Sequence, residues 1–245
     1  MKSYSFQVRH ELDSWSDVFI FDPLSMPLAS RLASAKTKPY YVTSLSLFAG
    51  TLAGASVLNG MYKPASFLYF ISVLLDSVDG KLARLLGEEK MLRRVFDQVA
   101  DQTVFAILVT CIILRNPNYA PQFTVLLLII LMYEVTLALR LDMARQVSGA
   151  PINEKIKIYS SALSFNKSTR SLLRLHNKLL SYSKRFRTWP YPKLSDIHLL
   201  LILFLLTLSC YIPYLMILFA LPDFLTSFII SITLAGKVDR EDVSI

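Results

Sequence analysis

The apolar residues of this chain gather in stretches of close to twenty residues, and this limits the possible folds more than any other feature. A helix needs about 20 residues to cross about 30 Å of hydrocarbon. Hydrophobic residues make up 53% of the 245 positions, and the mean hydropathy is +0.45. A soluble domain would struggle to bury so much apolar surface, so the sequence predicts an all-α integral membrane protein.

Six of these stretches are predicted to be transmembrane helices. They cover residues 42–58, 64–75, 95–114, 121–139, 197–211 and 214–235. The fifth is short, and only Ile212-Pro213 separates it from the sixth, so five spans is the alternative. The predicted domains are an interfacial N-terminal segment (1–41), a membrane domain (42–236) with a cytoplasmic insertion at 148–195, and a cytoplasmic tail (237–245).

Lysines and arginines are distributed very unevenly between the predicted loops. Of the 26 in the chain, only Lys63 and Arg115 lie in the loops after the first, third and fifth spans. Because positive residues favour the cytoplasmic side, this predicts a multi-pass protein of the cell membrane with both termini in the cytoplasm. The net charge of +8 is explained by this asymmetry and by anionic lipid headgroups, so no nucleic-acid partner is expected.

Two segments outside the spans are predicted to lie on the membrane surface. Apolar and polar residues alternate from Asp17 to Lys36, which favours an amphipathic helix along the interface. The insertion holds leucines among many lysines and arginines, which indicates a basic amphipathic helix on anionic lipid, with a substrate lid as the alternative. The two cysteines are isolated in apolar stretches and predict neither disulfides nor a thiolate metal site.

Four aspartates lie near the cytoplasmic ends of the second and third spans. Asp76 and Asp79 are spaced i,i+3, and Asp97 and Asp101 are spaced i,i+4, so each pair shares one face of its helix. At about 1.5 Å per residue, Asp76 and Asp101 are both roughly 18 to 20 Å from the outer face. Because the two helices are antiparallel, Asp76 should face Asp101 and Asp79 should face Asp97. We therefore expect four carboxylates to converge.

Such a cluster predicts a bound cation, because like charges gathered away from bulk water repel one another. Carboxylates without histidine or cysteine favour Mg²⁺ or Mn²⁺, with Ca²⁺ possible. The alternative is ion pairing within the protein, with Lys81, Arg84, Arg93 and Arg94 as the available cations. A metal at this depth suits phosphoryl chemistry, with one acid removing a proton from an attacking hydroxyl.

Three residues after the first aspartate pair suit a phosphate ligand. Gly80 and Ala83 continue the stripe of Asp76 and would let a ligand approach the backbone, although small residues also serve tight helix packing. Arg84 follows as a two-pronged phosphate donor.

The pattern Asp76-x-x-Asp79-Gly80-x-x-Ala83-Arg84, followed by Asp97 and Asp101, resembles the signature of the CDP-alcohol phosphotransferase family. The resemblance implies a two-metal site with Asp76, Asp79, Asp97 and Asp101 as ligands, and Asp101 also as general base. Gly80, Ala83 and Arg84 would hold the cytidine diphosphate of a CDP-linked lipid donor. An alcohol would attack the lipid-side phosphorus and expel CMP, and the resemblance also implies a homodimer.

The sequence departs from the family pattern at two places. In the stretch from Pro39 to Thr43, Tyr40 stands where the family has asparagine. Arg93 replaces a glycine close to the nucleotide. Its side chain turns outward, or the nucleotide end is bound differently, or activity is altered or lost. Lys90 lies where relatives often carry a small hydroxyl residue near the donor, and it is either a phosphate contact or a solvated lysine.

The acceptor is predicted from Arg140 and Arg145, at the end of the fourth span. Ionisable residues at this level are functional candidates, so we expect one of them to bind the phosphate of a phosphorylated polyol, although snorkelling to lipid headgroups explains both equally. Two alternatives to a transferase remain: a cation transporter that uses the same acids, and an inactive family member that acts as an interaction protein. No pair of inverted repeats, a common feature of transporters, is visible in the sequence, and this argues against the transporter.

Overall fold

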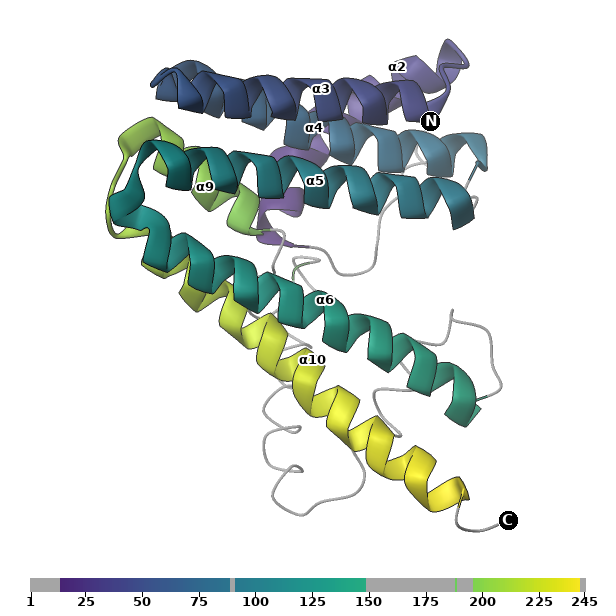
Figure 1. The fold of residues 1–245 in the computed structure, drawn as a ribbon. Coiled ribbons are helices and arrows are strands. Elements are labelled where there is room, and N and C mark those ends of the chain that lie inside the picture. Colours follow the sequence, from purple (N-terminus) through teal and green to yellow (C-terminus); the bar gives the residue numbers. More distant parts are fainter. Residues whose placement is uncertain (1–13, 89–90, 149–187, 189–195, 243–245) are drawn as a thin grey trace.

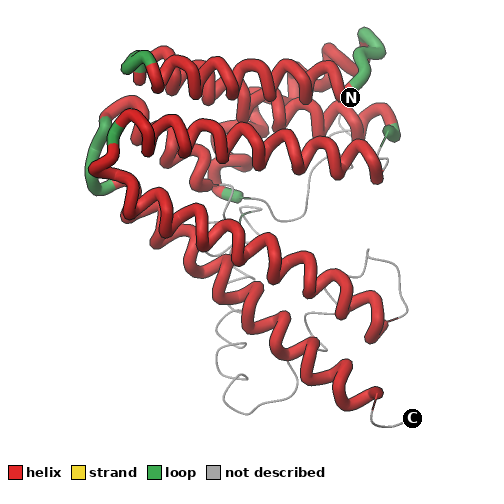
Figure 2. Tube along the Cα trace, viewed as in Figure 1, coloured by secondary structure: helices red, strands yellow, loops and turns green. Residues whose placement is uncertain are grey.

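The computed structural model describes residues 14–88, 91–148, 188 and 196–242, which form helices and no strand (Figure 2). In chain order the elements are η1 (Asp17–Phe21, one π-helical turn), α2 (Asp22–Ser34), α3 (Pro39–Leu58), α4 (Tyr62–Leu86), α5 (Met91–Arg115), η2 (Pro117–Tyr119, one 3-10 turn), α6 (Ala120–Ser148), α9 (Asp196–Thr207) and α10 (Ile212–Asp242). The all-α prediction is confirmed for this part of the chain.

Three helical stretches among the described residues are long and apolar enough to cross a membrane. They are Pro39–Leu58, Val95–Arg115 and Pro117–Thr136, and Asp196–Thr207 and Ile212–Leu225 are shorter apolar helices. Helix α4 is not in this set, and it carries Lys63 at one end and Asp76 and Asp79 toward the other. The membrane character of the chain therefore rests on three helices, and six spans stays a prediction.

The helices form two groups (Figure 1). Helices α3, α4 and α5 lie side by side, and α2 and α9 both pack on α4. Helices α6 and α10 form a second pair. The two helices are parallel to each other, and the pair diverges from the first group. A continuous apolar core links both groups through Phe123 of α6, Phe204 of α9 and Met216 of α10.

Small residues let α3 approach its two neighbours closely. Ser46 and Ser72 donate hydrogen bonds to each other's backbone carbonyls, both at 2.8 Å. A Cβ added at Gly50 would lie 2.3 Å from Val104 Cγ1 of α5, and one at Gly54 would lie 3.0 Å from Ile107 Cγ2. Gly50 and Gly54 thus serve close helix packing within the chain.

Gly50→Ala should lower the free energy of unfolding by about 1–3 kcal/mol, because the added methyl overpacks a buried contact. Thermal unfolding of purified protein in detergent measures this change. Gly80→Ala is the matched control, since a Cβ there meets only Arg84 Nη1 at 3.9 Å. Equal destabilisation by the two substitutions would contradict the close packing of α3 on α5.

The predicted amphipathic segment is helical, as η1 and α2. In α2 the buried positions are Asp22, Ser25 and Ala29, and Phe21 at the end of η1 is buried in the apolar core, whereas Phe19 and Leu24 are exposed. Helix α2 packs on α4 through both polar and apolar contacts and leaves Leu24 exposed on its outer face, as a helix at a lipid interface would.

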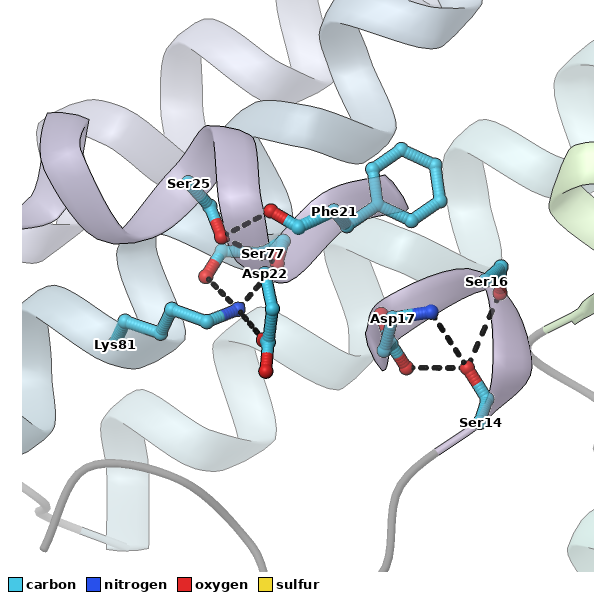
Figure 3. Close-up of polar contacts among 8 residues, drawn as sticks. All are labelled: Ser14, Ser16, Asp17, Phe21, Asp22, Ser25, Ser77 and Lys81. Atoms are coloured by element: carbon cyan, nitrogen blue, oxygen red, sulfur yellow. Dashed lines mark hydrogen bonds and ion pairs between the residues drawn. The ribbon is translucent and has the colours of Figure 1, made fainter. Parts of the chain in front are cut away.

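Hydrogen bonds and an ion pair fasten this N-terminal segment (Figure 3). Lys81 Nζ of α4 lies 2.9 Å from Asp22 Oδ1 and donates a 2.6 Å hydrogen bond to Ser77 Oγ. The backbone N–H of Ser16 donates to Asp196 Oδ1 of α9 at 2.7 Å. The segment thus bridges two helices that are far apart in the sequence.

The boundary between the last two helices differs from the prediction. Helix α9 ends at Thr207 rather than at residue 211, and Leu208 has a φ of +50° in the turn that follows. Ile212-Pro213 does not form the turn but begins α10, where a proline is tolerated because first-turn N–H groups have no helical partner. The basic insertion lies, apart from Ser148 and Thr188, outside the described residues.

Candidate metal centre

The aspartates are placed by the antiparallel pair α4 and α5. Helix α4 continues past the predicted span 64–75 to Leu86 and is capped by Gly87, whose φ of +67° suits glycine. The chain then returns as α5, which begins at Met91. Carboxylate oxygens of Asp76, Asp79 and Asp97 lie within 4.8 Å of one another. Three of the four predicted ligands therefore converge.

Asp101 is not a member of that group of three. It lies four residues beyond Asp97, one turn further along α5. The facing of Asp76 with Asp101 and of Asp79 with Asp97 stays a prediction, and the fourth carboxylate lies outside the group of three.

Asp79 is the most enclosed of these carboxylates, and both of its oxygens accept hydrogen bonds. Its side chain is 0% exposed. Thr43 Oγ1 of α3 donates to Oδ2, and Arg93 Nη2 of α5 donates to Oδ1 at 2.8 Å. Thr43 is the last residue of the stretch from Pro39 to Thr43 that was compared with the family pattern. Its hydrogen bond holds Asp79 in place from a third helix, α3.

Arg93 points into the site. Of the three alternatives for Arg93, the one in which its side chain turns outward is wrong, because the side chain is only 16% exposed and pairs with Asp79. The physical reason is charge: a buried carboxylate beside two others attracts the nearest cation. In part, then, the ion-pairing alternative also holds in this structure.

The three grouped carboxylates suit a hard divalent cation. Asp97 Oδ1 is buried and has no hydrogen-bond partner within the described residues. A buried acceptor without a donor is costly unless something else satisfies it. Three carboxylates that offer oxygens within a few ångströms of one another match the ligand preference of Mg²⁺ or Mn²⁺. The residues therefore fit the metal that the sequence predicted.

The other candidate residues divide into three groups. Gly80 faces open space, which suits a ligand and not the packing alternative, and its nearest neighbour would be Arg84. Ala83 is fully buried, as that alternative expects. Lys90 and the side chains of Arg140 and Arg145 lie outside the described residues.

Sequence reasoning missed two polar contacts near the site. Tyr69 OH lies 2.6 Å from His198 Nδ1, and this contact joins α4 to α9. Lys81 was considered only as a cation for the aspartates, but it pairs with Asp22. Neither could be found from spacing, because each joins residues more than 50 positions apart.

Comparison with known proteins agrees with this site. A family model described as CDP-alcohol phosphatidyltransferase matches residues 36–183, which include all four aspartates. The chain belongs to this family. The chain is also 31% identical over 83 residues to a CDP-diacylglycerol–serine O-phosphatidyltransferase of Mycobacterium leprae (strain TN).

The likeness to that relative is limited in extent. The aligned part covers 34% of this chain and 28% of the relative. No solved structure matches the chain. Membership of the family is therefore secure, and the reaction and its substrates are matters for a proposal.

Proposed function

We propose that this protein transfers a phosphoalcohol group of phosphatidyl type from a CDP-linked lipid to the hydroxyl of a small alcohol, with release of CMP, in phospholipid synthesis. One observation carries the proposal: the oxygens of Asp76, Asp79 and Asp97 lie within 4.8 Å of one another in a chain of this family. An inactive family member would have no need to retain such mutual repulsion.

In the proposed reaction, the acceptor hydroxyl oxygen forms a bond to the phosphorus that carries the lipid. The bond from that phosphorus to the bridging oxygen of the diphosphate breaks, and CMP leaves with the bridging oxygen. Asp101 takes the hydroxyl proton, since it stands beside the cluster and outside the group of three.

The other residues bind and orient the donor. Asp76, Asp79 and Asp97 would hold Mg²⁺ or Mn²⁺, with Asp101 as a further ligand in a two-metal site. Such ions, when bound, neutralise the diphosphate and the charge that develops on leaving CMP. The open face at Gly80 admits the donor close to the backbone, and Arg84, whose Nη1 lies nearest that face, contacts a phosphate.

We place the site on the cytoplasmic side of a six-span membrane domain that starts near residue 42, with both termini on the same side. The uneven distribution of lysine and arginine supports this orientation. The apolar outer face of η1 and α2, with Phe19 63% exposed, supports the position of this segment at the interface. Dimerisation is proposed from the family alone.

Two acceptor classes are supported by different observations. Arg140 and Arg145 on α6 suit the phosphate of a polyol such as glycerol phosphate or inositol phosphate. The relative from Mycobacterium leprae is named for serine, and this supports an amino alcohol instead.

Incubation of purified protein in detergent with CDP-diacylglycerol, Mg²⁺ or Mn²⁺, and single acceptors should release CMP with one acceptor class only. CMP is quantified by chromatography, and chelation of the metal should stop its release. If a polyol phosphate is the acceptor, Arg140→Ala should weaken its apparent affinity. Metal flux into vesicles without CMP release would instead favour the transporter.

A further inference from the structure

The ion pair between Arg93 and Asp79 joins a cation of the protein to a proposed metal ligand. Arg93 enters from the first turn of α5, and its Nη2 lies 2.8 Å from Asp79 Oδ1. Thr43 donates to the other oxygen of the same carboxylate. Both oxygens of Asp79 are therefore engaged by donors, whereas Asp97 Oδ1 has none within the described residues.

The charge of the cluster explains why Arg93 lies there. Three carboxylates close together and partly shielded from water repel one another, and a cation lowers that cost. A guanidinium keeps its charge at any physiological pH and forms directional hydrogen bonds to carboxylates, so it suits this role well. In the metal-free protein, Arg93 supplies compensation that a metal would otherwise supply.

The same position makes Arg93 a competitor for metal. The guanidinium hydrogen-bonded to Asp79 Oδ1 takes up one of the lone pairs of that oxygen, and it repels any cation placed beside it. We infer that Arg93 is an internal counter-ion of the metal-free site, which must leave Asp79 when a divalent cation binds, and that it thereby weakens metal affinity. This inference rests on the proposed metal site.

Loss of the arginine charge should change two measurable properties in opposite directions. Metal affinity should rise, because the competing cation is gone. The stability of the metal-free protein should fall, because the carboxylates lose their compensation. A residue with only a structural role would lower stability without raising metal affinity, so the affinity distinguishes the two roles.

Arg93→Gln is the informative substitution, because glutamine can still donate a hydrogen bond but carries no charge. In the full-length protein in detergent, titration with Mn²⁺ followed by electron paramagnetic resonance gives the Kd. We expect the Kd of Arg93→Gln to fall at least about tenfold. The repulsion energy between two charges a few ångströms apart near a protein surface is larger than the free energy to which a tenfold change in Kd corresponds. Arg93→Lys restores the charge and should restore the wild-type Kd.

Arg115→Gln is the matched control. It removes the same charge from the exposed far end of the same helix, about 33 Å from Arg93 along the axis, and should leave the Kd unchanged. Thermal unfolding without metal should show a lower melting temperature for Arg93→Gln than for Arg115→Gln.

Each other outcome overturns the inference in a recognisable way. An unchanged or weaker affinity in Arg93→Gln, with wild-type protein that binds Mn²⁺, would overturn the role of Arg93 and leave the proposed metal site intact. No Mn²⁺ binding by either protein would overturn both the inference and the proposed site.

Discussion

Asp97→Asn should abolish metal-dependent CMP release and weaken Mn²⁺ binding by at least about 100-fold, since changes to the partners of metal ligands alone cost 10–100-fold. Asp97 is the proposed ligand with a buried, unpartnered oxygen and faces Asp76 and Asp79 across the helix pair. Asparagine keeps the size of the side chain but removes the charge that attracts the cation. Electron paramagnetic resonance of Mn²⁺ and CMP chromatography measure the two effects.

The fold should survive this substitution, because removal of one charge relieves repulsion among the carboxylates. The metal-free Asp97→Asn protein should therefore melt no lower than the wild type, and added metal should no longer raise its melting temperature. Glu134→Gln provides the control: Glu134 accepts hydrogen bonds from Gln98 and Gln102 and lies outside the group of three. Wild-type Mn²⁺ affinity in Asp97→Asn would contradict the proposed metal centre.

Lys81→Met should destabilise the protein by about 3–5 kcal/mol, the usual result when one partner of a buried ion pair is removed. Lys81 and Asp22 are 5% and 3% exposed, so the remaining carboxylate of Asp22 would lose its cation in a place that water scarcely reaches. Because Lys81 also donates to Ser77, the contact between α2 and α4 should loosen. Unfolding in a denaturing detergent measures the change.

Lys63→Met is the control for Lys81→Met. Lys63 is exposed at the opposite end of α4, and its loss should change stability by no more than about 0.5 kcal/mol. Adding Asp22→Asn to Lys81→Met should recover part of the loss, because the buried carboxylate that has lost its ion pair with Lys81 is removed as well. Equal effects of Lys81→Met and Lys63→Met would show that the buried pair contributes nothing to stability.

The cytoplasmic half of α4 shows how far local pattern reaches. Nothing from Asp76 to Leu86 except Gly80 disfavours a helix, and the helix does continue to Leu86. The end of α9 shows the opposite case: its apolar run extends to Tyr211, but the chain turns from Leu208, where tertiary contacts override hydropathy. One of these contacts is the hydrogen bond from Tyr119 OH to the carbonyl of Leu208.

The sequence by itself determined the helical class, the helix that carries each aspartate, and the shared face of each pair. These follow from the period of the α-helix and from the length of apolar stretches, which are properties of neighbouring residues. Only the tertiary structure decided that Arg93 turns inward to Asp79, that Thr43 donates a hydrogen bond to the same carboxylate, and that Lys81 forms an ion pair with Asp22. Such pairings depend on how separate helices pack and on which charge lies nearest, and no spacing within one helix fixes either.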